Sequence, residues 1–140
     1  MAFQIVLGLL MTAFTVGLGV IIVVFAAEVL LRNRAFLIDA GRFVHHVMTL
    51  SLIATWLVMG ILVVSYVWAL LLLGLGVFGT FEVALYFSMI SFTTVGYGDL
   101  VPPENWRMLA AFISVDGFLL FGLNTAFLFE VLRRMRDDER

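Results

Sequence analysis

The stretch Thr93-Thr94-Val95-Gly96-Tyr97-Gly98-Asp99 lies between two long apolar segments and decides which fold this sequence can adopt. Successive carbonyls of an extended chain normally point in opposite directions, so aiming several of them to one side requires some residues with positive φ. Gly96 and Gly98 accept that conformation without a Cβ clash. The stretch therefore predicts a short strand that offers backbone carbonyls as ligands for a cation.

An ordinary glycine turn is the alternative, because Gly-Tyr-Gly-Asp usually forms one in a soluble protein. The surroundings of the stretch argue against that alternative. A short apolar segment at 80–92 precedes it, with Thr80 placed to cap a helix and Glu82 near the positive end of the helix dipole. Pro102-Pro103 and a further long apolar segment follow it. This order is typical of a re-entrant loop that lines a cavity within a membrane.

Composition also places the chain in a membrane. Of the 140 residues, 64% are hydrophobic and only 13% are charged, whereas soluble domains carry roughly 25% charged residues. The mean hydropathy is +1.15. The chain has no cysteine, which excludes disulfides and thiolate metal sites, and its net charge of -2 gives no basis for binding nucleic acid.

Residues from about 65 to 135 resemble the pore domain of tetrameric potassium channels, most closely the small bacterial ion-channel proteins with a two-helix pore unit. The resemblance rests on the motif at 93–99, on residues 84–88 in the expected pore helix and on residues 117–122 in the expected inner helix. It implies a homotetramer in the lipid bilayer that conducts K+ passively through a central pore. The first apolar segment has no counterpart in that unit.

Three apolar segments are long enough to cross a bilayer core, which takes about 20 residues. They predict an all-α membrane protein with three transmembrane helices, a re-entrant pore helix and a selectivity filter per subunit. We expect residues 1–43 to hold the first helix and a basic cytoplasmic connection, and residues 44–140 to form the pore domain. Its expected elements are the outer helix, the pore helix, the filter and the inner helix, at residues 44–73, 80–92, 93–99 and 105–134.

The family implies a role for each candidate site residue. Potassium ions would be bound in the filter by Thr94, Val95, Gly96 and Tyr97, followed by Gly98. The remaining assignments are the outer mouth (Asp99 and Glu104), the filter support (Tyr86 and Thr93), the gating hinges (Gly117 and Gly122) and the cavity lining (Phe118, Phe121 and Thr125).

Two features of the expected filter depend on its surroundings. Val95 and Tyr97 should turn away from the pore axis and pack against surrounding helices. Some family members place a glutamate behind the filter as a partner for the final aspartate, but Ile90 stands at that position here. Asp99 must therefore stay solvated or find another partner, and Tyr86 is the expected donor.

Asp116 places a carboxylate inside the expected inner helix, where it is costly unless it meets a cavity or a partner. If Asp116 faces the cavity, four copies would attract cations and invite block by magnesium. If it faces away, it would be protonated or bonded to a hydroxyl such as that of Thr12, Thr15 or Ser65. At 100° per residue it lies about 200° from Phe118, which favours the buried structural role.

Arginine placement predicts the orientation. No arginine precedes the first helix, whereas arginines crowd the first connection and the tail, at positions 32, 34, 42, 133, 134, 136 and 140. The positive-inside rule then gives a multi-pass protein of the cell membrane with its amino terminus outside and its carboxyl terminus in the cytoplasm. A cleaved signal sequence is the alternative for the first segment, but that segment lacks a basic n-region and is too long.

Control of the pore has several candidate sources. No helix carries arginine at every third position, so steep voltage gating is not expected. His45 and His46 either sense pH at an intracellular gate or anchor the second helix among the headgroups, and the anchor is favoured. Lipids or a separate regulatory subunit are further sources of control.

In the first helix, Ala13 and Gly17 form a small-xxx-small pair that predicts a close helix contact.

Two other classes of function compete with the channel. The chain could be a non-conducting regulatory or scaffold subunit, or the translocating subunit of a potassium transport system. Such transporters usually join several altered filter loops in one polypeptide, and the single intact loop argues against that class. We expect no enzymatic activity, no cofactor other than permeant potassium ions and no nucleic-acid partner.

Overall fold

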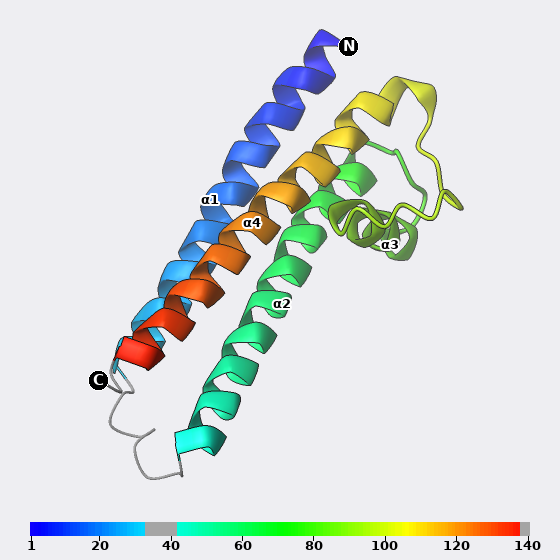
Figure 1. Cartoon of the computed structure of the whole chain (residues 1–140). Helices are drawn as coiled ribbons and strands as arrows, with labels where there is room; N and C mark the ends of the chain where they lie inside the picture. The colour runs from blue at the N-terminus through cyan, green and yellow to red at the C-terminus, as the bar shows by residue number, and fades with distance from the viewer. Residues whose placement is uncertain (33–41, 138–140) are drawn as a thin grey trace.

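The computed structural model describes residues 1–32 and 42–137, and the described residues are almost entirely helical. Three helices are long, namely α1 (Ala2–Arg32), α2 (Arg42–Gly74) and α4 (Arg107–Asp137). Three apolar stretches are long enough to cross a membrane: Ala2–Val29 in α1, Val47–Gly74 in α2 and Glu104–Met135, which begins just before α4. The three helices run side by side (Figure 1). The predicted all-α fold with three spanning helices is confirmed.

The short helix α3 (Phe81–Phe92) projects from one end of this bundle, beside α2 and α4 (Figure 1). It begins one residue later than expected because Thr80 is its N-cap. Thr80 has an extended backbone, with φ -135° and ψ 151°, and its hydroxyl accepts a hydrogen bond from the Val83 N–H at 3.4 Å. Between the filter and α4, the short 3-10 helix η2 (Glu104–Trp106) leads directly into Arg107.

Helix α1 packs against α4 and α2 of its own chain (Figure 1). Two glycines permit this close approach. A Cβ on Gly8 would lie 2.3 Å from the Phe112 ring, and one on Gly19 would lie 2.4 Å from Leu120. The predicted contact at Gly17 is wrong within the chain, because nothing in the described structure lies within 4 Å of a Cβ built there.

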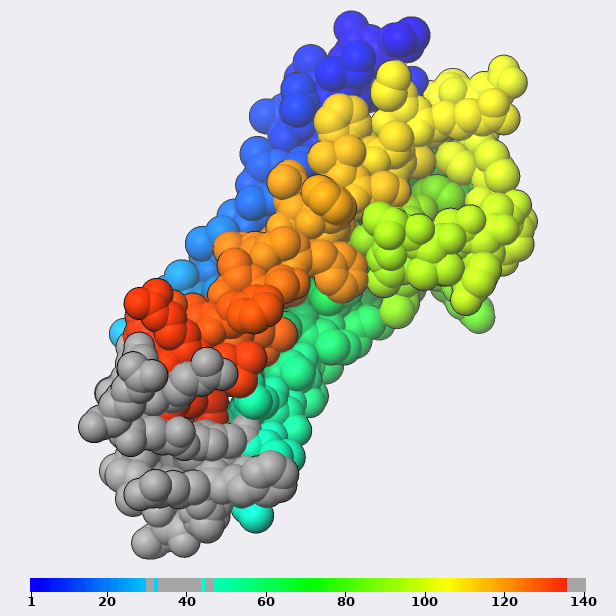
Figure 2. Space-filling model, in the orientation of Figure 1, coloured from blue at the N-terminus to red at the C-terminus, as the bar shows by residue number. Residues whose placement is uncertain are grey.

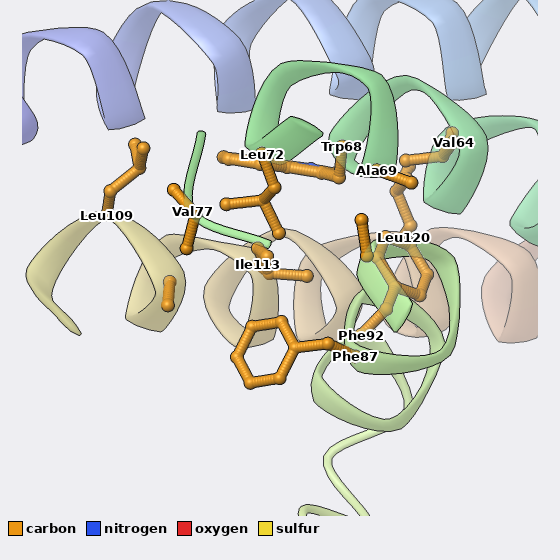
Figure 3. Close-up of a cluster of buried hydrophobic side chains, with 12 residues drawn as sticks. Val64, Trp68, Ala69, Leu72, Val77, Phe87, Phe92, Leu109, Ile113 and Leu120 are labelled. Atoms are coloured by element: carbon orange, nitrogen blue, oxygen red, sulfur yellow. The ribbon is translucent and has the colours of Figure 1, made fainter. Parts of the chain in front are cut away.

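The main core lies where α3 meets α2 and α4 (Figure 3). Trp68 and Leu72 from α2 and Ile113 from α4 are fully buried there, and Phe87 and Phe92 reach them from α3. Lipid tails are as apolar as these side chains, so close packing and dispersion hold the helices together rather than escape from water. This core fixes α3, and with it the start of the filter, against the two flanking helices.

The filter and the loops beside it form a lobe on one side of the bundle (Figure 2). Residues 94–99 are all exposed in the single chain. The fold therefore presents the predicted filter at the surface of one subunit, where copies of the chain could meet around it.

Candidate ion-conduction site

The filter backbone alternates in handedness from one residue to the next. Thr94, Gly96 and Gly98 have positive φ values of 60°, 49° and 78°, and the two residues between them do not. In an ordinary extended strand successive carbonyls point to opposite sides. Alternation is the pattern that turns them toward the same side, and the glycines adopt it at no steric cost.

Two N–H groups of this segment donate backbone hydrogen bonds, whereas its carbonyls accept none from the described residues. Thr94 N–H donates to the Ser91 carbonyl and Gly96 N–H donates to the Ile90 carbonyl, both at 3.0 Å. Among the described residues, no hydrogen bond ends on a carbonyl of residues 94–98. Carbonyls buried away from water normally find a protein partner, whereas these belong to exposed residues and remain open to an outside ligand. A row of exposed, unpaired acceptors is suited to a cation.

Thr94 was missed as a residue with positive φ, since sequence reasoning pointed only to the glycines. A β-branched residue in the left-handed region is an outlier that costs on the order of 1–3 kcal/mol, and such strain tends to cluster at functional sites. The hydrogen bond from its N–H to Ser91 fixes this conformation at the carboxyl end of α3.

Val95 and Tyr97 do not pack against helices of their own chain. Their exposed fractions are 52% and 73%, the latter among the highest of any large side chain in the molecule. Both side chains belong to the filter segment, so a surface that covers them would have to come from outside the subunit.

Tyr86 and Asp99 connect α3 to the carboxyl end of the predicted filter, which is its predicted outer end. The Tyr86 hydroxyl donates a hydrogen bond to Asp99 Oδ2 at 2.8 Å. This bond raises the pKa of Tyr86 above its ordinary value, because ionisation of the phenol would remove the donor to Asp99. Thr93 lies at the other end of the predicted filter, where its hydroxyl donates to the Met89 carbonyl at 2.8 Å and it forms the C-cap of α3.

We expect Tyr86→Phe to destabilise the outer end of the filter, because the ring is retained and only the donor to Asp99 is removed. A typical hydrogen bond corresponds to about a fivefold change in an equilibrium, so the steady-state ratio of conducting to inactivated channels in the reconstituted protein should fall about fivefold. Tyr66→Phe is the matched control, since that ring contacts Phe81 and lies outside the filter. Equal inactivation in the two variants would contradict the role given to Tyr86.

Gly117 and Gly122, both predicted as hinges, differ in their surroundings. A Cβ on Gly117 would lie 1.8 Å from the Phe92 carbonyl oxygen, so α4 touches the backbone of the pore helix there. Nothing in the described structure lies within 4 Å of a Cβ on Gly122. Gly117 is thus required for close packing, and hinge motion at either glycine stays a prediction.

The predicted cavity-lining residues lie on an open face of α4. Phe118 is 74% exposed and Phe121 is 39% exposed. Thr125 is also exposed, and its hydroxyl donates to the Phe121 carbonyl at 2.8 Å within the helix. The Phe121 ring lies 6.3 Å from that of Phe92, between centroids, so this face begins directly beneath the filter.

Asp116 lies on the opposite side of α4 and is fully buried. Its Oδ2 atom lies 2.5 Å from the Thr15 hydroxyl and accepts a hydrogen bond from the Trp68 indole N–H at 2.6 Å. The Thr15 hydroxyl, which has a single proton, also lies 2.7 Å from the Met11 carbonyl and shares its donation between the two acceptors. Thr15 was one of three hydroxyls proposed from the sequence. Trp68 was missed, and the only signal for it is that a buried indole N–H usually finds an acceptor.

Glu104, predicted to lie at the outer mouth, pairs with Arg107 at 3.6 Å, and both side chains are largely exposed. Such a pair contributes little to stability.

The side chains of His45 and His46 lie outside the described residues, and so do Arg34 and Arg140. The role of the histidines and the orientation of the chain stay predictions.

Comparison with known proteins agrees with this geometry. A family model described as "Ion channel" matches residues 51–134, which is more than half of the chain, and the chain therefore belongs to that ion channel family. The calcium-gated potassium channel TvoK of Thermoplasma volcanium is 43% identical over 58 residues, which cover 41% of this chain and 17% of that channel. The matched part is thus a small fraction of that relative's length. No solved structure was found to match.

These two matches confirm the resemblance to the pore domains of small potassium channels. The chain is a multi-pass membrane protein of the ion channel class.

Proposed function

We propose that this chain is one subunit of a potassium-selective channel and that four copies surround a single central pore. The proposal rests on the backbone of the predicted filter. The sign of φ alternates along residues 94–98, and the carbonyls of these residues accept no hydrogen bond from the described residues. Four such strands around one axis supply rings of oxygens that replace the hydration shell of a potassium ion. Potassium ions are the permeant ligands, bound at Thr94, Val95, Gly96 and Tyr97, and no other cofactor takes part.

The tetramer also accounts for the exposed side chains of the filter. In a ring of four copies, Val95 and Tyr97 pack against the neighbouring subunit and hold the filter open at a fixed width. Phe118, Phe121 and Thr125 then line the cavity below it, while Asp116 stays on the far side of α4. The amino terminus is outside the cell membrane, so the filter lies toward the outer face and the inner helix leads to the cytoplasm.

Passive flux distinguishes this proposal from its rivals. The purified chain, reconstituted into liposomes without nucleotide or a second ion gradient, is expected to release potassium down its gradient. The protein mass of the purified assembly in detergent is expected to equal that of four chains. A non-conducting regulatory or scaffold subunit would assemble without flux, and a transport subunit would need an energy source or a partner. Either result would overturn the proposal.

A further inference from the structure

One turn of α4 contacts the base of the filter on one side and the other two long helices on the opposite side. On the filter side, the Ser114 hydroxyl donates to the Ser91 carbonyl at 3.0 Å and Gly117 lies directly against the Phe92 carbonyl. These two carbonyls belong to the last residues of α3, immediately before Thr93. This turn of α4 is therefore in direct contact with the residues that lead into the predicted filter.

On the other side, Asp116 joins three helices at a single carboxylate oxygen. Thr15 of α1 and Trp68 of α2 both donate to Oδ2, and all three side chains are fully buried. The second oxygen, Oδ1, has no hydrogen-bond partner among the residues that the structure describes. A buried polar atom without a partner is costly, and an apolar residue here would avoid that cost. Packing alone does not account for a carboxylate at this position.

Helix α1 is also attached above and below this level. Near the outer end, Gln4 donates to the Asn105 carbonyl and accepts from the Leu109 N–H. Toward the other end, the Trp56 indole donates to the Ile22 carbonyl at 3.1 Å. Helix α1 is thus bound to the pore unit along its length, and Asp116 is its contact at the level of the filter base.

We propose that Asp116 is a positioning residue through which α1 holds the filter in its conducting form. Thr15 and Trp68 hold the carboxylate, the carboxylate holds its turn of α4, and that turn supports the carbonyls of Ser91 and Phe92. This role rests on the proposed channel function. It gives the first helix, which lies outside the shared two-helix unit, a task in conduction.

The test removes each donor in turn: Thr15→Val keeps the shape of its side chain, whereas Trp68→Phe keeps an aromatic ring but also removes part of the indole volume from the core. Thr15→Val and Trp68→Phe are compared with Thr12→Val, a matched control on the same helix whose buried hydroxyl has no partner among the described residues. Thr15→Ser restores the donor. Single channels of each homotetramer are recorded in planar bilayers at several external potassium concentrations, and the thermal stability of each tetramer is measured alongside.

Thr15→Val and Trp68→Phe are each expected to lower the ratio of conducting to non-conducting time about tenfold, which corresponds to about 1.4 kcal/mol. The loss should shrink as external potassium rises, since bound ions support the filter from within. Unit conductance should stay unchanged, and Thr15→Ser and Thr12→Val should behave as the parent chain. The positioning role is wrong if Thr15→Val and Thr12→Val have the same ratio of conducting to non-conducting time. It is also wrong if the loss in Thr15→Val does not depend on the external potassium concentration. Absence of current in the parent chain would instead overturn the channel function itself.

Discussion

Gly117→Ala is expected to abolish potassium flux and to lower the yield of assembled protein. The added Cβ would lie 1.8 Å from the Phe92 carbonyl oxygen, and real Cβ contacts essentially never fall below 3.0 Å. The obstacle is backbone, which cannot rotate away as a side chain can, so α4 and α3 must separate at the base of the filter. Overpacking of this kind costs about 3 kcal/mol, equivalent to more than a hundredfold change in the population of the native arrangement. Liposome flux and the fraction of tetramer in size-exclusion chromatography measure the effect.

Gly122→Ala is the matched control, five residues further along the same helix. Its Cβ would meet nothing in the described structure, and alanine is the better helix former by about 1 kcal/mol. We therefore expect normal flux and equal or greater thermal stability. If the two variants lose flux alike while both remain assembled, the glycines act as hinges, and the account of Gly117 as a packing contact is contradicted.

Gly96→Ala is expected to destroy selectivity for potassium over sodium. Gly96 has a φ of 49°, where an L-residue costs roughly 1–2 kcal/mol, and a tetramer would bear that cost four times around one ring of ligands. The strand would relax toward negative φ and turn a carbonyl ring away from the axis. Parallel potassium and sodium flux assays in liposomes measure the change, and the ratio of the two rates is expected to fall toward about one once the carbonyl rings are lost.

The control for this variant is Gly79→Ala. Gly79 lies in the turn before α3, has no positive φ, and has open space where the Cβ would be placed. Its selectivity should equal that of the parent chain. Retained potassium selectivity in Gly96→Ala would show that the backbone geometry at this position is not what selects the ion.

Much of this architecture could be predicted because it depends on local chemistry. Apolar length alone located the three spanning helices, and the capping preference of Thr80 located the start of α3 to within a residue. The angular separation of Asp116 from Phe118 on a helix favoured burial of the carboxylate, and the structure places it there. Each of these inferences uses only the period of a helix or a preference of one residue type.

What could not be predicted depends on contacts between distant segments. Trp68 lies 48 residues from the carboxylate it contacts, and no pattern in the sequence brings them together. Gly117 and Gly122 look alike in sequence, yet only Gly117 faces another backbone. The positive φ of Thr94 contradicts the preference of a β-branched residue, so only the surrounding structure could reveal it.

The reversal potential of the unmodified protein tests the central claim most directly. Purified chain is inserted into a planar bilayer with potassium chloride on one side and sodium chloride at equal concentration on the other. If rings of carbonyls from residues 94–97 select the ion, the potential should lie far from zero, with the sign set by potassium leaving its own compartment. A reversal near zero, with current carried equally by sodium, would contradict the account.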